Sequence, residues 1–92
     1  MNELLRAQKI NGILICLSDI IIMPQLSKIE LPEDCGLIFD ATQILGLIAA
    51  KSMENPLQWF TDKQKFILMG ATHKTLPGPT CGLIMTNNLE LA

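Results

Sequence analysis

Three polar groups in this sequence directly follow apolar runs that have the length of buried strands. Ser18 follows the run ILICL, Asp40 follows LIF, and Lys74 follows FILMGAT with His73 immediately before it. In an open α/β sheet, ligands bind beyond the carboxyl ends of the strands. If the three runs are parallel neighbours, a hydroxyl, a carboxylate and an amine therefore face one crevice.

This combination of groups suits one cofactor in particular. A lysine amine bonds to an aldehyde, an aspartate holds a protonated ring nitrogen, and a hydroxyl group hydrogen-bonds a phenolic oxygen. Pyridoxal phosphate carries all three features. Each residue also has an ordinary explanation: Lys74 as a solvated strand end, Asp40 as a helix N-cap, Ser18 as a loop serine, and His73 as a packed or hydrogen-bonded side chain.

The strands that must position these residues are read from apolar runs without polar alternation. Such runs are typical of strands buried on both faces of a mostly parallel sheet. The sequence predicts about four of them, at residues 13–17, 37–40, 65–69 and 81–86. The predicted fold class is therefore α/β, with short helices in the connections.

Two helices are expected. Residues 2–9, NELLRAQK, have helical spacing of apolar residues, and residues 41–51 are rich in alanine and leucine and end before Asn55-Pro56. Two short helices cannot cover both faces of a four-stranded sheet. We therefore expect the 92 residues to form one partial domain that a partner chain or flanking segments complete.

Composition excludes several function classes. A net charge of −2 and a pI of about 5.2 give no basic field for nucleic acid or for an anionic membrane. The longest apolar stretch, residues 13–23, is too short for a membrane span and is interrupted by Ser18 and Asp19.

Cysteine usage and the N-terminal residues indicate the compartment. The three cysteines, Cys16, Cys35 and Cys81, are odd in number and lack metal-ligand spacing, so we expect reduced thiols and no metal site. No small-residue cleavage site follows the first apolar run. A cytoplasmic protein is expected.

Two segments resemble the serine hydroxymethyltransferase family. IFDATQILGLIAAKSMENPL is similar to that family's D-x-A-H-x-x-G-L-x-A-x segment, and GATHKTLPGPTCGLI is similar to its T-H-K-T-L-x-G-P-x-x-G-x-I segment. The separation of the two segments also fits, and the resemblance extends over about residues 13–86. It implies the central part of the large domain of a fold-type-I pyridoxal-phosphate enzyme.

The resemblance implies a role for each candidate residue. Lys74 would form the Schiff base with the cofactor aldehyde, and Asp40 would hold the pyridinium proton. Ser18 would lie near the phenolic oxygen. The remaining implied cofactor-binding residues are Thr72, His73 and Gln43.

The chain also departs from the family pattern. Gln43 stands where the family commonly has histidine, and glutamine can donate a hydrogen bond but cannot titrate. Met69-Gly70-Ala71 precede Thr72 where the family often has threonines, and Pro77 replaces a usual arginine. These departures make the general family a safer expectation than the exact activity.

The implied activity is the interconversion of serine and glycine with tetrahydrofolate as the one-carbon carrier, in a homo-oligomeric enzyme. The family holds the cofactor phosphate with an N-terminal segment and the substrate carboxylate with a C-terminal arginine, so this chain alone is expected to bind weakly and to be inactive. One alternative is another pyridoxal-phosphate aldolase or aminotransferase. An alternative of a different class is a non-catalytic remnant or an interaction module.

Overall fold

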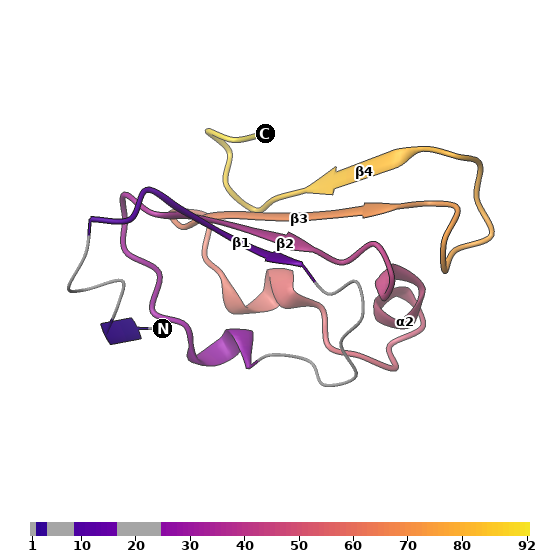
Figure 1. The fold of residues 1–92 in the computed structure, drawn as a ribbon, viewed down its shortest axis with the longest axis horizontal. Coiled ribbons are helices and arrows are strands. Elements are labelled where there is room, and N and C mark those ends of the chain that lie inside the picture. The colour runs from indigo at the N-terminus through magenta and orange to yellow at the C-terminus, as the bar shows by residue number, and fades with distance from the viewer. Residues whose placement is uncertain (1, 4–8, 17–24) are drawn as a thin grey trace.

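The computed structural model contains a single four-stranded sheet with the order β1-β2-β3-β4 (Figure 1). It describes residues 2–3, 9–16 and 25–92. The strands are β1 (Gly12–Cys16), β2 (Gly36–Asp40), β3 (Lys65–Ala71) and β4 (Gly82–Met85). β1, β2 and β3 are parallel, and β4 is antiparallel to β3. The predicted α/β class and mostly parallel sheet are thus confirmed.

The register of the parallel strands aligns their carboxyl ends. Cys16 at the end of β1 is paired with Asp40 at the end of β2, and Asp40 is paired with Met69 of β3. The connections that follow these strands therefore leave the sheet from one edge. We call this the carboxyl edge; it lies at the right of Figure 1.

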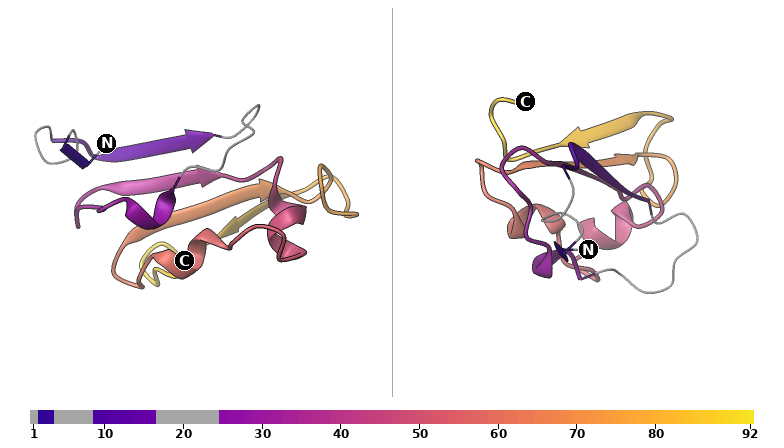
Figure 2. Two further views of the ribbon diagram at one scale, coloured as in Figure 1. Left: turned by 90° about the horizontal axis from the view of Figure 1, so that it is seen from below. Right: turned by 60° about the vertical axis from the view of Figure 1, so that its left-hand side comes forward.

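The described helices lie on one face of the sheet (Figures 1 and 2). They are η1 (Leu26–Lys28), α2 (Leu45–Ala49) and η2 (Pro56–Trp59). Side chains of β2 and β3 that point to these helices form the core, which includes Leu37, Phe39, Phe66 and Leu68. The ring of Phe60, just after η2, stacks on Phe66 with a centroid distance of 4.1 Å.

The second predicted helix is shorter than expected. Residues 41–51 were expected to be helical, but α2 begins only at Leu45, because a turn follows β2 and contains a hydrogen bond from the Thr42 N–H to the Asp40 carboxylate. The helix ends before Lys51, whose φ of 61° lies in the left-handed region.

Of the first predicted helix, residues 2–3 are helical, and residues 4–8 lie outside the described part of the chain. No helix among the described residues is both long and apolar enough to cross a membrane.

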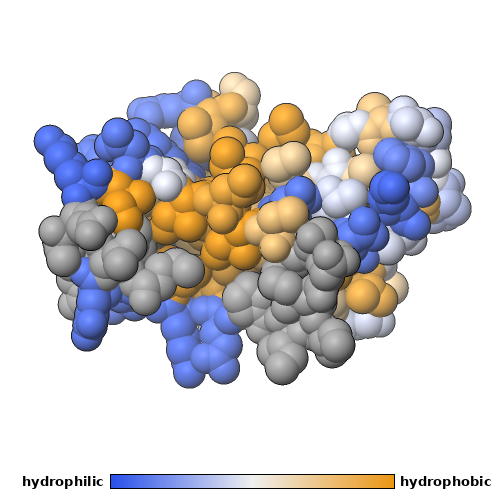
Figure 3. Space-filling model, viewed as in Figure 1, coloured by the Kyte–Doolittle hydropathy of each residue, from blue (hydrophilic) through white to orange (hydrophobic). Residues whose placement is uncertain are grey.

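The other face of the sheet is apolar, and no described helix covers it. We call it the open face. Its side chains alternate with the core side chains along each strand. Large apolar residues are exposed there: Leu14 by 66%, Ile38 by 38%, Met69 by 36% and Ile84 by 73%. Figure 3, which looks across the sheet rather than onto the open face, shows apolar residues gathered at the centre of the molecule. The expectation that the helices leave the sheet incompletely covered holds for the described residues.

The difference between a buried and an exposed leucine predicts different costs for the same substitution. Leu68 is fully buried and Leu47 on α2 is 44% exposed. We expect Leu68→Ala to lower the free energy of unfolding by about 2–5 kcal/mol, because it leaves a cavity in the core. Leu47→Ala should change it by about 0.5 kcal/mol or less. Urea denaturation of both variants tests this, and equal costs would contradict the assigned core.

Candidate functional site

The residues predicted to bind a cofactor gather at the carboxyl edge. Asp40 is the last residue of β2, and Gln43 lies in the turn between β2 and α2. Thr72, His73 and Lys74 follow β3 directly, at the start of the connection to β4. Ser18 lies outside the described residues. The structure thus brings five of the six predicted residues to one edge of the sheet.

Asp40 accepts hydrogen bonds on both carboxylate oxygens. Its Oδ1 accepts from the backbone N–H of Thr42 at 3.0 Å and from the Thr42 hydroxyl. Its Oδ2 accepts from Cys16 Sγ at 3.6 Å, across the β1–β2 pair. The Thr42 hydroxyl bond is the largest cause of a lowered pKa of Asp40; partial burial opposes it, while the Thr42 N–H and the Cys16 thiol add to the lowering. Asp40 is therefore ionised at neutral pH.

The alternative reading of Asp40 as a helix N-cap is wrong. Helix α2 begins at Leu45, and its N-cap position is Ile44, without a side-chain hydrogen bond. The Asp40 side chain instead stabilises the turn immediately after β2, through Thr42. Among the described residues, the second oxygen, Oδ2, has only a long contact with a thiol and can accept another donor.

The loop that carries Lys74 is tied together by Thr72. The Thr72 backbone N–H donates to the Cys81 carbonyl at 3.0 Å, and its hydroxyl donates to the Pro79 carbonyl. The Gly78 N–H donates back to the Thr72 carbonyl at 3.0 Å, an approach so close that a Cβ on Gly78 would lie 2.7 Å from that oxygen. The hydroxyl proton of Thr72 is thus used inside the loop.

The same loop is held against α2 one residue after Lys74. The Gly46 N–H donates to Thr75 Oγ1 at 2.8 Å. A Cβ on Gly46 would lie only 2.4 Å from the Thr75 carbonyl oxygen, so no side chain fits at this position. The connection after β2 and the connection after β3 are therefore joined in direct contact.

Lys74, His73 and Gln43 are exposed. Within the described part of the chain, no hydrogen bond or ion pair involves the Lys74 amine. A lysine side chain without a carboxylate partner is available to a ligand. The edge therefore combines an ionised carboxylate at a strand end with an unpaired amine on a fixed loop.

Sequence reasoning missed the residues that position this loop. Thr75 is part of the T-H-K-T motif but has no role in the sequence prediction, and Gly46 lies inside the helix predicted at residues 41–51. A glycine inside an alanine- and leucine-rich helix is itself a signal of close packing. Cys16 and Thr42, the side-chain partners of Asp40, carry no recognisable motif.

Gly46→Ala tests the contact between α2 and the Lys74 loop. Alanine normally stabilises a helix interior by about 1 kcal/mol relative to glycine. Here we expect a loss of about 1–3 kcal/mol, because the new methyl group overlaps the Thr75 backbone. Amide hydrogen exchange in residues 72–80 should become faster. Gly82→Ala is the matched control, since nothing lies within 4 Å of its Cβ position. A stabilising Gly46→Ala would contradict the contact.

The hydrogen bonds to Asp40 predict that the stability of the fold depends on pH. The folded pKa of Asp40 lies below its ordinary value of 3.8, so these bonds contribute stability above that value, and the contribution is lost as the pH falls through the folded pKa. Thr42→Val should raise the pKa of Asp40 toward 3.8, because it removes the largest cause of the shift. Carboxyl-carbon NMR titration measures this. Thr61→Val, at an exposed site, is the control, and an unchanged titration in Thr42→Val would refute the assignment.

Comparison with known proteins finds relatives that carry the same name. Three curated proteins named serine hydroxymethyltransferase are similar to this chain. The protein of Thermococcus onnurineus is 44% identical over 64 residues, which are 70% of this chain and 14% of that protein. The proteins of Staphylothermus marinus (50% identical over 50 residues, 54% of this chain and 10% of that protein) and Methanothermobacter marburgensis (38% identical over 71 residues, 75% of this chain and 16% of that protein) are also similar. No protein-family model matches. The chain spans 10–16% of the length of these relatives. Over that span, the chain belongs to the serine hydroxymethyltransferase family.

Proposed function

We propose that this chain contributes the lysine and aspartate of a pyridoxal-phosphate site in a serine hydroxymethyltransferase-like enzyme. The observation that carries the proposal is the contact, at one edge of the sheet, between the connection that follows β2 and the connection that follows β3. Asp40 ends β2, Lys74 follows β3, and the Gly46–Thr75 hydrogen bond fixes one connection to the other. The names of the similar proteins support the same function.

The described residues fit the chemistry of this cofactor. Asp40 is ionised, and its Oδ2 could accept a hydrogen bond from a protonated ring nitrogen in place of the long thiol contact. Lys74 supplies an unpaired amine for the cofactor aldehyde. When bound, pyridoxal phosphate supplies an electron sink for bonds made and broken at an amino acid.

The neighbouring residues then have secondary roles. Thr72 keeps the shape of the Lys74 loop, since its hydroxyl proton is directed to Pro79. The exposed side chains of His73 and Gln43 can hydrogen-bond the cofactor or the substrate from the two joined connections. Ser18 is proposed as the partner of the phenolic oxygen.

The reaction we propose is transfer of a hydroxymethyl group between serine and glycine, with tetrahydrofolate as the carrier. The assigned residues account for the aldehyde and the ring nitrogen of the cofactor. A partner chain or flanking segments would supply the groups that hold the phosphate and the substrate carboxylate. The thiols of Cys16 and Cys81 are exposed and are not in disulfides, which suits a reducing, cytoplasmic environment.

The cofactor assignment can be tested on the chain by trapping. The purified chain is mixed with pyridoxal phosphate and reduced with borohydride, and the modified peptides are mapped. We expect Lys74 to be modified severalfold more than the exposed control Lys51, and Asp40→Asn to remove this preference. Equal modification of the two lysines, or no modification at Lys74, would rule out the site.

The reaction is tested separately. Serine cleavage is measured with and without tetrahydrofolate, with the flanking segments of a relative supplied in trans. Dependence on tetrahydrofolate supports the hydroxymethyltransferase reaction. Amino transfer to an added keto acid would instead assign the chain to an aminotransferase.

A further inference from the structure

The carboxylate of Asp40 is held unequally at its two oxygens. Oδ1 accepts hydrogen bonds from the Thr42 N–H, at 3.0 Å, and from the Thr42 hydroxyl, whereas Oδ2 has the Cys16 thiol at 3.6 Å. Each oxygen of a carboxylate offers about two acceptor sites. Both sites of Oδ1 are therefore taken by one residue, while Oδ2 keeps a site that no other described residue uses.

The two residues that donate to this carboxylate differ in how firmly they hold it. Thr42 lies two positions after Asp40 and is half-buried, so its N–H and its hydroxyl close a local turn on Oδ1. Cys16 is exposed at the end of the neighbouring strand β1, and a thiol is a weak donor. A ligand that donates a hydrogen bond thus replaces the thiol on Oδ2 far more readily than it replaces Thr42 on Oδ1.

We propose that Thr42 is a positioning residue, whose hydroxyl fills Oδ1 of Asp40 and so directs the charged ring nitrogen of the cofactor to Oδ2. Thr42 touches the carboxylate and not the cofactor, so it acts only through Asp40. Two hydrogen bonds to Oδ1 also resist rotation of the carboxylate, because a turn of its plane breaks both. This inference rests on the proposed function and adds a residue that orients one of its two principal groups.

The resemblance to the family does not imply this role. In the family segment D-x-A-H, alanine stands at the position of Thr42. Alanine has no hydroxyl, so the hydrogen bond from the Thr42 side chain to Oδ1 is a feature of this chain. The same alanine indicates that the turn accepts a residue without a hydroxyl, which makes Thr42→Ala a suitable variant.

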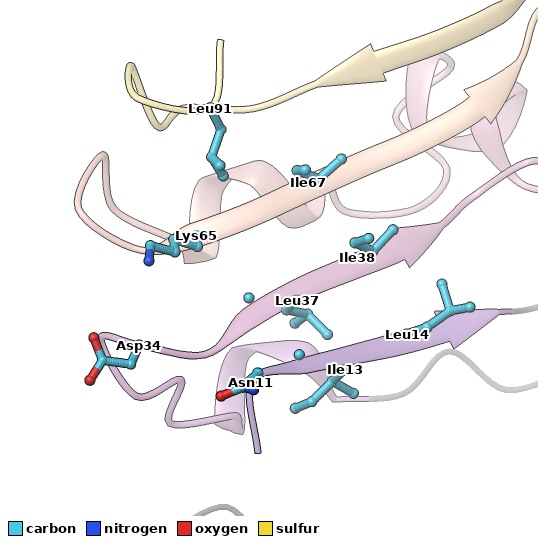
Figure 4. Close-up of a pocket in the computed structure, with 11 residues that line it drawn as sticks. Asn11, Ile13, Leu14, Asp34, Leu37, Ile38, Lys65, Ile67 and Leu91 are labelled. Atoms are coloured by element: carbon cyan, nitrogen blue, oxygen red, sulfur yellow. The ribbon is translucent and has the colours of Figure 1, made fainter. Parts of the chain in front are cut away.

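A pocket on the open face could also take an aldehyde, and the experiment must separate it from the carboxyl edge. The pocket lies toward the amino ends of the strands, with Lys65 at its end (Figure 4). Its lining includes neither Asp40 nor Lys74. Modification of Lys65 therefore reports on this pocket, and modification of Lys74 reports on the carboxyl edge.

Borohydride trapping with two aldehydes measures what the ring nitrogen contributes. The purified chain is treated with pyridoxal phosphate or with its carbon analogue, in which C–H replaces the ring nitrogen. The ratio of modification by the two aldehydes at Lys74 is divided by the same ratio at the exposed Lys51, which removes their difference in intrinsic reactivity. We expect a corrected ratio severalfold above one in the unmodified sequence and close to one in Asp40→Asn.

Substitutions at Thr42 test the positioning role. Thr42→Val and Thr42→Ala keep the backbone N–H on Oδ1 but remove the hydroxyl, and each should lower the corrected ratio about threefold or more, since a hydrogen bond to a charged group is lost. Thr42→Ser keeps a hydroxyl and should restore the ratio. Thr61→Val, at an exposed site, should leave it unchanged. Circular dichroism confirms that the variants are folded.

Cys16→Ala separates the two oxygens of the carboxylate. It removes the donor on Oδ2, the oxygen that the ring nitrogen would use, so the corrected ratio should stay at its original value or rise. A fall as large as that in Thr42→Val would overturn the proposal, because any donor to Asp40 would then have the same effect.

The outcomes also distinguish this inference from the proposed function. With pyridoxal phosphate, equal modification of Lys74, Lys51 and Lys65 would contradict the proposed function, and a ratio unaffected by Asp40→Asn would remove both Asp40 and Thr42 from the site. A preference for Lys74 that Asp40→Asn abolishes, but that Thr42→Val and Thr42→Ala leave unchanged, would overturn the positioning role alone.

Discussion

Parallel pairing of β2 with β3 determines where the functional groups of this chain lie. Because the two strands run in the same direction, Asp40 at the end of one and the Lys74 loop after the other leave the sheet at the same edge. Antiparallel pairing would place them at opposite edges. Both strands also provide the buried center of the core, with Phe39 and Leu68 fully buried. The interaction that stabilises the fold is thus also the one that assembles the candidate site.

Much of this arrangement could be predicted from the apolar runs. A run without polar alternation indicates a strand buried in a parallel sheet, and all four predicted strands are found within one or two residues of the expected bounds. The direction of β4 was not specified by its own residues. The short Pro-Gly-Pro connection between Thr72 and Cys81 does carry that information, since a parallel crossover needs a dozen or more residues.

The length of α2 shows where local propensity gives way to tertiary contacts. Alanine and leucine favour helix throughout residues 41–51, but Asp40 and Thr42 form a competing turn at the start. The helix is further constrained at Gly46 by the backbone of Thr75. Contacts between segments that lie 29 positions apart in the sequence leave no periodic pattern. A site residue defined by its chemistry is thus easier to predict than a residue that positions it.

Asp40 lies where the apolar open face meets the carboxyl edge. The open face needs an apolar cover, whereas the carboxylate needs a charged or polar partner. Alternation along β2 directs its side chain to the open face, together with Ile38, while the Lys74 loop is anchored to α2 on the helix-covered face. A ligand at the carboxyl edge would therefore be approached from both sides of the sheet. The apolar part of the open face needs a cover, but the carboxylate at its end needs a charged or polar partner. Any layer that packs on the open face must stop short of Asp40 or supply a donor to it, so the position of this one carboxylate limits how far that layer can extend.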